Sequence, residues 1–231
     1  MSTYFQVLVF SIIIPLIFSF HNKIQFYKKW PAFIRANFLV TIPFLIWDEL
    51  FTRWGVWGFT HEHLAGFYLF SLPAEEILFF IIIPYCCVFT YEVFLKIKLK
   101  SNKITHLLTL GIGVIILLSG ILFLNKIYTA ITFISLGVLL VILSSRKQQF
   151  ANTFYLTYLI ITGSFFIIVN GILTGGTLDP PPVWYNDSET LNIRIWTIPI
   201  EDFFYSMLLI LCNIWLFEIF KSKRLHKKAL R

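Results

Sequence analysis

The sequence predicts an all-α polytopic membrane protein with seven transmembrane helices, organised as two parallel three-helix repeats joined by a linker helix. Three observations predict this fold. First, 58% of the 231 residues are hydrophobic and only 13% are charged, a balance typical of integral membrane proteins. Second, seven apolar runs approach or reach the length of a spanning helix. Third, a short sequence motif at the start of the third run recurs 126 residues later, at the start of the last run.

The apolar runs can be counted along the chain, since crossing the hydrocarbon core takes about 20 residues of helix. The second run is the weakest, because Pro43 interrupts it and Arg35 and Asp48 border its apolar centre. The first run does not have the pattern of a cleavable signal peptide, since it lacks a preceding basic segment and a small-residue cleavage site. We expect helices near residues 3–20, 33–49, 72–95, 104–123, 127–144, 152–173 and 198–220.

The distribution of Lys and Arg predicts the orientation of these helices. Cytoplasmic loops are enriched in both residues, and here 16 of the 19 lie in four segments that alternate with the other loops. We therefore expect a multi-pass protein of the plasma membrane with its N-terminus outside and its C-terminus in the cytoplasm. The net charge of +7 follows from this topology and does not indicate a nucleic-acid partner. The basic segments are 21–35, 96–103, 144–150 and 221–231, and the other basic residues are Arg53, Lys126 and Arg194.

The repeated motif divides the chain into two repeats with a linker between them. LPAEEILFF at 72–80 corresponds to IPIEDFFYS at 198–206. We expect a first repeat over 1–100, a linker helix over 101–125 and a second repeat over 126–231. The linker helix returns the chain to the outer face, so both repeats insert with the same polarity and are related by an axis along the membrane normal.

Each copy of the motif places two adjacent carboxylates at the start of an apolar helix, two residues after a proline. They are Glu75 and Glu76 in the first copy and Glu201 and Asp202 in the second. Charges in a spanning helix are costly. A single pair could simply satisfy the free N–H groups and the dipole of a helix start. Its duplication instead indicates that the four acids form one buried catalytic site. We expect one carboxyl to stay protonated as a general acid beside an ionised general base.

Aromatic side chains accompany both acid pairs. One helical turn below each first glutamate lies an aromatic residue, and Trp-rich segments occupy both long outer loops. An acid above an aromatic wall suits carbocation chemistry, because aromatic faces stabilise a cation. Ordinary helix packing and the aromatic belt of membrane proteins are the alternative interpretations. The candidate substrate-binding residues are Phe79, Phe80, Tyr205, Trp54, Trp57 and Trp184.

Two further polar residues occupy loosely equivalent places near helix ends, Asp48 in the second helix and Asn170 in the sixth. We expect both to supply hydrogen bonds to the carboxylates. Glu92 and Glu218 also repeat, 17 residues beyond the first glutamate of each pair and beside the Lys clusters. We interpret these two as solvated acids at the cytoplasmic interface.

The sequence lacks the motifs of metal, dinucleotide and diphosphate binding. The His61-Glu62-His63 segment has no matching ligands in the second repeat, so we predict no metal site. Three cysteines lie inside apolar runs and are interpreted as small packing residues. No glycine-rich dinucleotide fingerprint is present, so no cofactor is evident. Aspartate-rich magnesium motifs are also missing, and no outer basic cluster could hold a diphosphate. The substrate is therefore expected to be uncharged.

The chain resembles the small membrane lycopene cyclases of the heterodimeric type, here as one fused polypeptide. The resemblance rests on the repeated Pro-x-Glu-(Glu/Asp) at Pro73–Glu76 and Pro199–Asp202, on the WGVW-F stretch at 54–59 and on the seven spans. It covers nearly the whole chain. In the second copy an Asp replaces the second Glu, and Ser206 replaces Phe80, which leaves room for different roles in the two halves.

This resemblance implies a lycopene β-cyclase of carotenoid biosynthesis. Protonation of the terminal double bond of lycopene would start ring closure, and loss of a proton would leave a β-ionone end, with no net redox change. Glu75 or Glu201 would be the acid, assisted by Glu76 or Asp202. The implied partners are membrane lipid and the carotenoid substrate. A requirement for reduced flavin or nicotinamide stays open, as does association with a second copy or with other pathway enzymes.

Alternatives remain open. The same acids could form ε- or γ-rings, cyclise fifty-carbon carotenoids or hydrate the end group. A proton-coupled membrane transporter would use repeated acids to bind protons or cations, and an interaction-only subunit would not need them. A retinal-type photoreceptor is disfavoured, because residues 203–220 contain no Lys.

Overall fold

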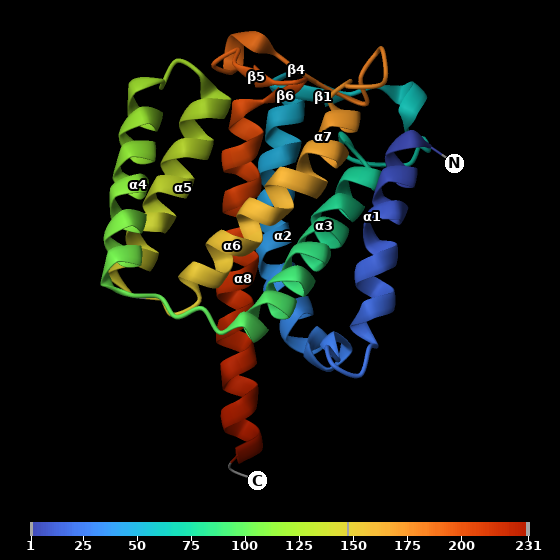
Figure 1. The fold of residues 1–231 in the computed structure, drawn as a ribbon. Coiled ribbons are helices and arrows are strands. Elements are labelled where there is room, and N and C mark those ends of the chain that lie inside the picture. The colour runs from blue at the N-terminus through green and yellow to red at the C-terminus, as the bar shows by residue number, and fades with distance from the viewer. Residues whose placement is uncertain (1, 147, 230–231) are drawn as a thin grey trace. The chain divides into compact units, whose positions relative to one another are not determined.

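The computed structural model describes residues 2–146 and 148–229 and is predominantly helical, as the sequence predicts (Figure 1). Among the described residues, six helices are long and apolar enough to cross a membrane. They correspond to the second through seventh predicted spans. The helix at the position of the first span has 17 residues and is shorter than these six.

The chain forms two compact units. In the first unit, α1 and α2 both pack against α3, which carries the first acid pair. The unit also contains the part of α8 that begins at Leu209. Its elements are α1 (Thr3–Ser19), the 3₁₀ helix η1 (Phe26–Lys29), α2 (Trp30–Arg53), η2 (His61–His63), β2 (Tyr68–Leu69), β3 (Leu72–Pro73), α3 (Ala74–Phe94) and α8 (Ile200–Ala229), with η3 (Leu95–Ile97) at its border.

The second unit contains the helix pair α4–α5, the interrupted helix α6–α7 and the start of α8, which carries the second acid pair. A π-helical segment, η4, joins α6 to α7 without a break, so the predicted sixth span is continuous. The elements are β1 (Trp57–Phe59), α4 (Lys103–Leu122), α5 (Ile127–Ser145), α6 (Ala151–Ile161), η4 (Thr162–Phe166), α7 (Ile167–Leu173), β4 (Val183–Tyr185), η5 (Asp187–Glu189), β5 (Arg194–Ile195) and β6 (Ile198–Pro199).

The predicted starts of the two acid-bearing helices were two residues early. Leu72–Pro73 and Ile198–Pro199 form strands β3 and β6, and the helices begin at Ala74 and Ile200. Pro73 has the extended backbone of an N-cap residue, with φ −68° and ψ 151°. Each first glutamate is therefore the second helical residue.

A proline inside α3 is compensated by the neighbouring helix. Pro84 has no N–H to donate to the carbonyl of Phe80, four residues earlier. Asn37 Nδ2 and Thr41 Oγ1 of α2 donate to that oxygen instead, over 2.9 and 3.1 Å. Proline is tolerated in spanning helices where neighbouring side chains re-satisfy the freed carbonyl in this way. These bonds tie α2 to the helix that carries the first acid pair.

The proline of α1 is compensated similarly. Pro15 cannot donate to the carbonyl of Ser11, and Cys86 Sγ of α3 lies 3.4 Å from that oxygen as a donor. Cys86 therefore makes a polar contact in addition to the packing role that the sequence suggested. Prolines in both helices are accommodated by polar contacts between helices of one unit.

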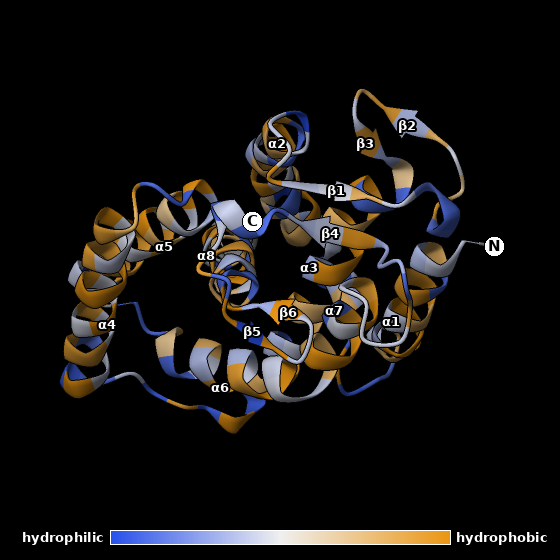
Figure 2. Cartoon of the chain, turned by 90° about the horizontal axis from the view of Figure 1, so that it is seen from above, coloured by the Kyte–Doolittle hydropathy of each residue, from blue (hydrophilic) through white to orange (hydrophobic). Residues whose placement is uncertain are grey.

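Helices α4 and α5 lie side by side and pack closely through glycine (Figure 1). A Cβ atom added to Gly137 of α5 would lie 2.7 Å from Leu117 Cβ and 2.8 Å from the carbonyl oxygen of Gly113 in α4. Small residues allow such close backbone approach between membrane helices. Figure 2 shows that α4 is mainly hydrophobic around its circumference, and its exposed residues include Leu107, Ile115 and Leu118.

We expect Gly137→Ala to destabilise the second unit by about 1–3 kcal/mol, since the added methyl group overpacks a contact that includes backbone atoms. Thermal unfolding of the detergent-solubilised protein measures the effect. Gly111→Ala is the matched control, because nothing lies within 4 Å of the added Cβ and alanine favours the helix. Equal melting temperatures for the two variants would contradict the prediction.

Candidate functional site

A short hairpin leads into each acid-bearing helix. Strand β2 pairs with β3 and β5 with β6, at the same 126-residue offset as the sequence repeat. The first turn residue has a left-handed backbone in both hairpins, with φ 57° at Phe70 and 59° at Trp196. The first helical N–H also donates to an equivalent carbonyl, from Ala74 to Phe67 and from Ile200 to Ile193. Both acid pairs are therefore presented by the same local structure.

In the first unit both acids are buried, with Glu75 1% and Glu76 8% exposed. Glu75 Oε1 accepts hydrogen bonds from Ser2 Oγ and from the backbone N–H of Ala65, each over 2.6 Å. Tyr4 donates its hydroxyl to Glu76 Oε2. Residues at the start of α1 thus hold both acids of the first pair.

In the second unit the arrangement recurs around Glu201, which is 0% exposed. Its Oε1 accepts from Thr129 Oγ1 over 2.5 Å and from the N–H of Leu191 over 2.6 Å. Ala65 and Leu191 are again 126 residues apart. Each first glutamate therefore receives one hydroxyl and one backbone N–H on the same oxygen.

Asp202 is bound by three side chains. Tyr128 donates to Oδ1 over 2.6 Å, and Asn170 Nδ2 and Tyr185 donate to Oδ2 over 2.6 and 2.9 Å. Both oxygens of this buried acid are engaged by protein donors. Such donors favour the ionised form of a carboxylate, whereas burial disfavours it.

The second oxygen of each first glutamate has a different environment. Glu75 Oε2 and Glu201 Oε2 are buried and have no hydrogen-bond partner among the described residues. A buried polar atom without a partner is unfavourable and calls for a ligand or a proton that explains it.

An aromatic cluster surrounds the second pair. Trp57 makes edge contacts with Tyr128, Tyr185 and Tyr205, at ring-centroid distances of 5.0, 6.2 and 6.1 Å. Tyr128 and Tyr185 stack at 6.0 Å, and both donate to Asp202. The hydroxyls of Tyr128 and Tyr185 connect this cluster of four rings to the Asp202 carboxylate.

The strands that carry Trp57 and Tyr185 pair with each other. β1 and β4 are antiparallel, with Gly58 opposite Trp184 (Figure 2). These two residues are also 126 apart, so the pairing of the strands has local two-fold symmetry. A Cβ on Gly58 would lie 2.3 Å from Trp184 Cζ2, so the indole needs glycine beneath it. The Trp-rich segments of the two outer loops, which the sequence showed to be similar, therefore form the paired strands β1 and β4.

The structure places the remaining predicted residues as follows. Asp48 is buried on α2 in the first unit, 1% exposed. Phe80 is buried and makes an edge contact with half-buried Phe79 at 5.6 Å. Trp54 and Trp184 are 57% and 43% exposed. The roles of these residues in substrate binding stay predictions.

The sequence analysis missed Tyr185, which donates to Asp202 from strand β4, and four hydroxyl residues at helix starts: Ser2, Tyr4, Tyr128 and Thr129. These four start the first helix of each half, more than 70 residues from the carboxylates that they contact. A signal was present, since Ser-Thr-Tyr at 2–4 and Tyr-Thr at 128–129 are hydroxyl clusters at corresponding helix starts. The repeat comparison was centred on the acid-bearing helices and did not extend to these segments.

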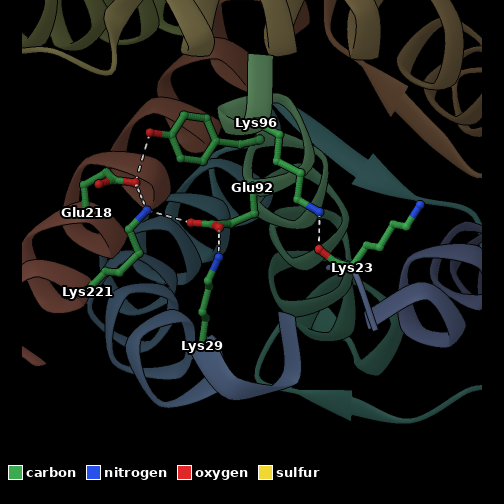
Figure 3. Close-up of polar contacts among 7 residues, drawn as sticks. Lys23, Lys29, Glu92, Lys96, Glu218 and Lys221 are labelled. Atoms are coloured by element: carbon green, nitrogen blue, oxygen red, sulfur yellow. Dashed lines mark hydrogen bonds and ion pairs between the residues drawn. The ribbon is translucent and has the colours of Figure 1, made fainter. Parts of the chain in front are cut away.

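Glu92 is not the solvated acid that the sequence suggested. Its side chain is 3% exposed and pairs with both Lys29 and Lys221, and Lys221 also pairs with Glu218 (Figure 3). Tyr91 donates to Glu218 over 3.0 Å. These residues form an ion network within the first unit that joins η1, α3 and α8. Burial of Glu92 follows from packing of three segments that are distant in the sequence.

The His61-Glu62-His63 segment forms η2, and no cluster suited to a metal ion occurs among the described residues. His61 Nδ1 lies 2.6 Å from the hydroxyl of Tyr68 in β2. Burial and the Glu75 carboxylate raise the pKa of the Tyr68 phenol above 10.0. This phenol therefore stays protonated at neutral pH and can donate to the histidine.

Comparison with known proteins identifies related sequences. The family model described as "Lycopene cyclase" matches residues 1–94 and 125–220, which include both acid pairs. The chain is also similar to a "Bifunctional lycopene cyclase/phytoene synthase" of Colletotrichum graminicola, 34% identical over 80 residues. That similarity covers 33% of this chain and 14% of the relative. No solved structure matches the chain.

Proposed function

Because the chain belongs to the lycopene cyclase family, we propose that it is a lycopene β-cyclase that closes the open ψ ends of lycopene to β-ionone rings. Family membership supports an enzyme that cyclises carotenoids. The observation that carries the proposal is the buried Oε2 of Glu75 and Glu201, each without a hydrogen-bond partner among the described residues. An acid that protonates an apolar alkene needs such an oxygen. Its partner is a carbon atom and offers no hydrogen bond before the reaction.

The proposed reaction is balanced without electron transfer. The O–H bond of the glutamic acid breaks as its proton adds to the terminal double bond, which leaves a tertiary cation. The neighbouring alkene donates its electrons to that cation and closes a six-membered ring. A C–H bond beside the new cation then breaks, its electrons form the ring double bond, and a carboxylate accepts the proton. The enzyme would therefore be an isomerase of the intramolecular lyase type, with γ-carotene and β-carotene as products.

The roles of the chain's own residues follow from this scheme. Thr129 and the N–H of Leu191 hold Glu201 through Oε1 and leave Oε2 for the substrate. Trp57 and Tyr205 would stabilise the cation with their aromatic faces. Water must be kept from the cation, and the burial of the acids supports that role.

The proposal includes the membrane topology. The 17 residues of α1 reach the lower end of the range for a spanning helix, so α1 would be the seventh span. The distribution of Lys and Arg supports an outer N-terminus and a cytoplasmic C-terminus, and we propose the plasma membrane as the location. The recurrence of hairpins and hydrogen bonds at one offset supports two repeats of the same polarity.

Expression in a host that accumulates lycopene tests the function. We expect γ-carotene and β-carotene to replace lycopene, as measured by chromatography with absorption spectra and mass. Unchanged lycopene, with the folded protein present in the membrane, would refute the cyclase proposal. Rings of the ε or γ type, or a hydrated end group, would refute the β-specific part alone.

A further inference from the structure

Two tyrosines make the same contact in the two units. Tyr4 at the start of α1 donates to Glu76, and Tyr128 at the start of α5 donates to Asp202. Both tyrosines are 1% exposed. In each case the acid that is contacted is the second of the pair. The first acid of each pair instead receives a hydroxyl from Ser2 or Thr129.

The two tyrosines do not occupy equivalent positions of the repeat. At the 126-residue offset, Tyr4 corresponds to Ala130 and Tyr128 corresponds to Ser2. The two halves therefore place a phenol on the second acid from different positions. Copying of one ancestral sequence does not by itself produce this arrangement, which indicates that the contact serves a purpose.

The two acids of a pair differ in their donors. In the second unit, Asp202 accepts three side-chain donors on its two oxygens, whereas Glu201 has one oxygen without a hydrogen-bond partner among the described residues. Hydrogen bonds to an ionised carboxylate are short and strong, and they strengthen further in surroundings of low dielectric constant. Three such bonds therefore hold the Asp202 carboxylate in place.

We propose that Tyr4 and Tyr128 are positioning residues of the cyclisation reaction: each holds the carboxylate of the second acid of its pair in place through a hydrogen bond. This inference rests on the proposed function and assigns the two acids of a pair different tasks. Glu75 and Glu201 deliver the proton, and Glu76 and Asp202 supply the negative charge and accept the proton that the ring releases.

The assignment has a chemical consequence that concerns products. The ring cation is lost by breakage of a C–H bond, whose proton goes to the carboxylate. If that carboxylate is no longer held, the acyclic cation and the ring cation both live longer. Water can then add, forming a C–O bond and releasing one of its own protons, so that a tertiary alcohol appears at the end group. Weakening of the tyrosine contact should thus increase the hydrated share of the product.

Tyr128→Phe and Tyr4→Phe test the inference in membranes supplied with lycopene. We expect kcat per folded protein to fall about ten-fold, since a hydrogen bond to a charged group is worth at least one factor of ten. KM should stay unchanged, and hydrated carotenoids should increase. The matched controls are Tyr155→Phe, whose hydroxyl contacts Thr109, and Tyr85→Phe, whose hydroxyl contacts Ser19.

Wild-type kcat and products in both acid-contacting variants would overturn the inference, as would an equal loss of kcat in the controls. A raised KM with unchanged kcat would also overturn it, because that result assigns the tyrosines to substrate binding. These outcomes differ from failure of the proposed function, in which the wild-type protein itself forms no cyclic carotenoid. The amount of folded protein is measured by size-exclusion chromatography in detergent.

Discussion

Replacement of Glu201 by glutamine will lower the rate of lycopene cyclisation by about a hundred-fold or more, because the amide has no acidic proton to deliver. Glutamine has the shape of glutamate, and its carbonyl oxygen can still accept from Thr129 and from the N–H of Leu191. The variant should therefore remain folded. Carotenoid products in a lycopene-accumulating host, normalised to the amount of protein in the membrane, measure the effect.

The same substitution at Glu75 tests the first unit, where Ser2 and Ala65 make the corresponding contacts. Loss of activity in only one of the two variants would identify the acid that protonates the substrate. Glu62→Gln is the control, since Glu62 is an exposed carboxylate of η2. Full activity of both Glu75→Gln and Glu201→Gln would show that neither Oε2 delivers the proton.

Replacement of Lys221 by methionine will lower the free energy of unfolding by about 3 kcal/mol, because it removes a partner from a buried carboxylate. Glu92 is 3% exposed, and among the described residues its one remaining ion-pair partner would be Lys29, whose side chain is 36% exposed. Glu218 would lose its lysine as well (Figure 3). For a chain of this size the melting temperature should fall by roughly 10 °C, as measured by thermal unfolding in detergent.

A double variant distinguishes loss of the ion network from general damage to α8. Lys221→Met combined with Glu92→Gln should recover part of the loss, since the buried charge is then gone and Lys29 can reach water. Arg53→Met is the control for an exposed pair, because Arg53 is 57% exposed and bonds Glu49 one turn earlier. Its expected cost is about 0.5 kcal/mol. Equal losses for Arg53→Met and Lys221→Met would refute the structural importance of the network.

Much of the helical architecture could be predicted from the sequence, because a spanning helix needs a long apolar run and such runs are visible in one dimension. Six of the seven predicted spans correspond to helices long enough to cross a membrane. The proline segments before both acid pairs were also readable as helix starts. Their strands β3 and β6 were not predicted, since two-residue strands depend on a hairpin partner.

Most partners of the acids could not be predicted. Asn170 does donate to Asp202, a contact that its place near a helix end suggested, although its role in catalysis stays a prediction. Tyr4 and Tyr128 are ordinary residues of apolar helices until the packing of α1 on α3, and of α5 near the start of α8, brings them to the carboxylates. Glu92 was misread for the same reason, because its two lysines lie on other segments.

The apolar runs and the position of the four carboxylates at the starts of two of them could be read from the order of residues along single segments. How the four acids differ from one another follows from helix packing. Helix packing places tyrosine hydroxyls on the second acid of each pair and leaves Oε2 of the first acid buried without a described partner. A hydrogen bond between residues more than 70 positions apart depends on three-dimensional packing, which local sequence patterns do not encode.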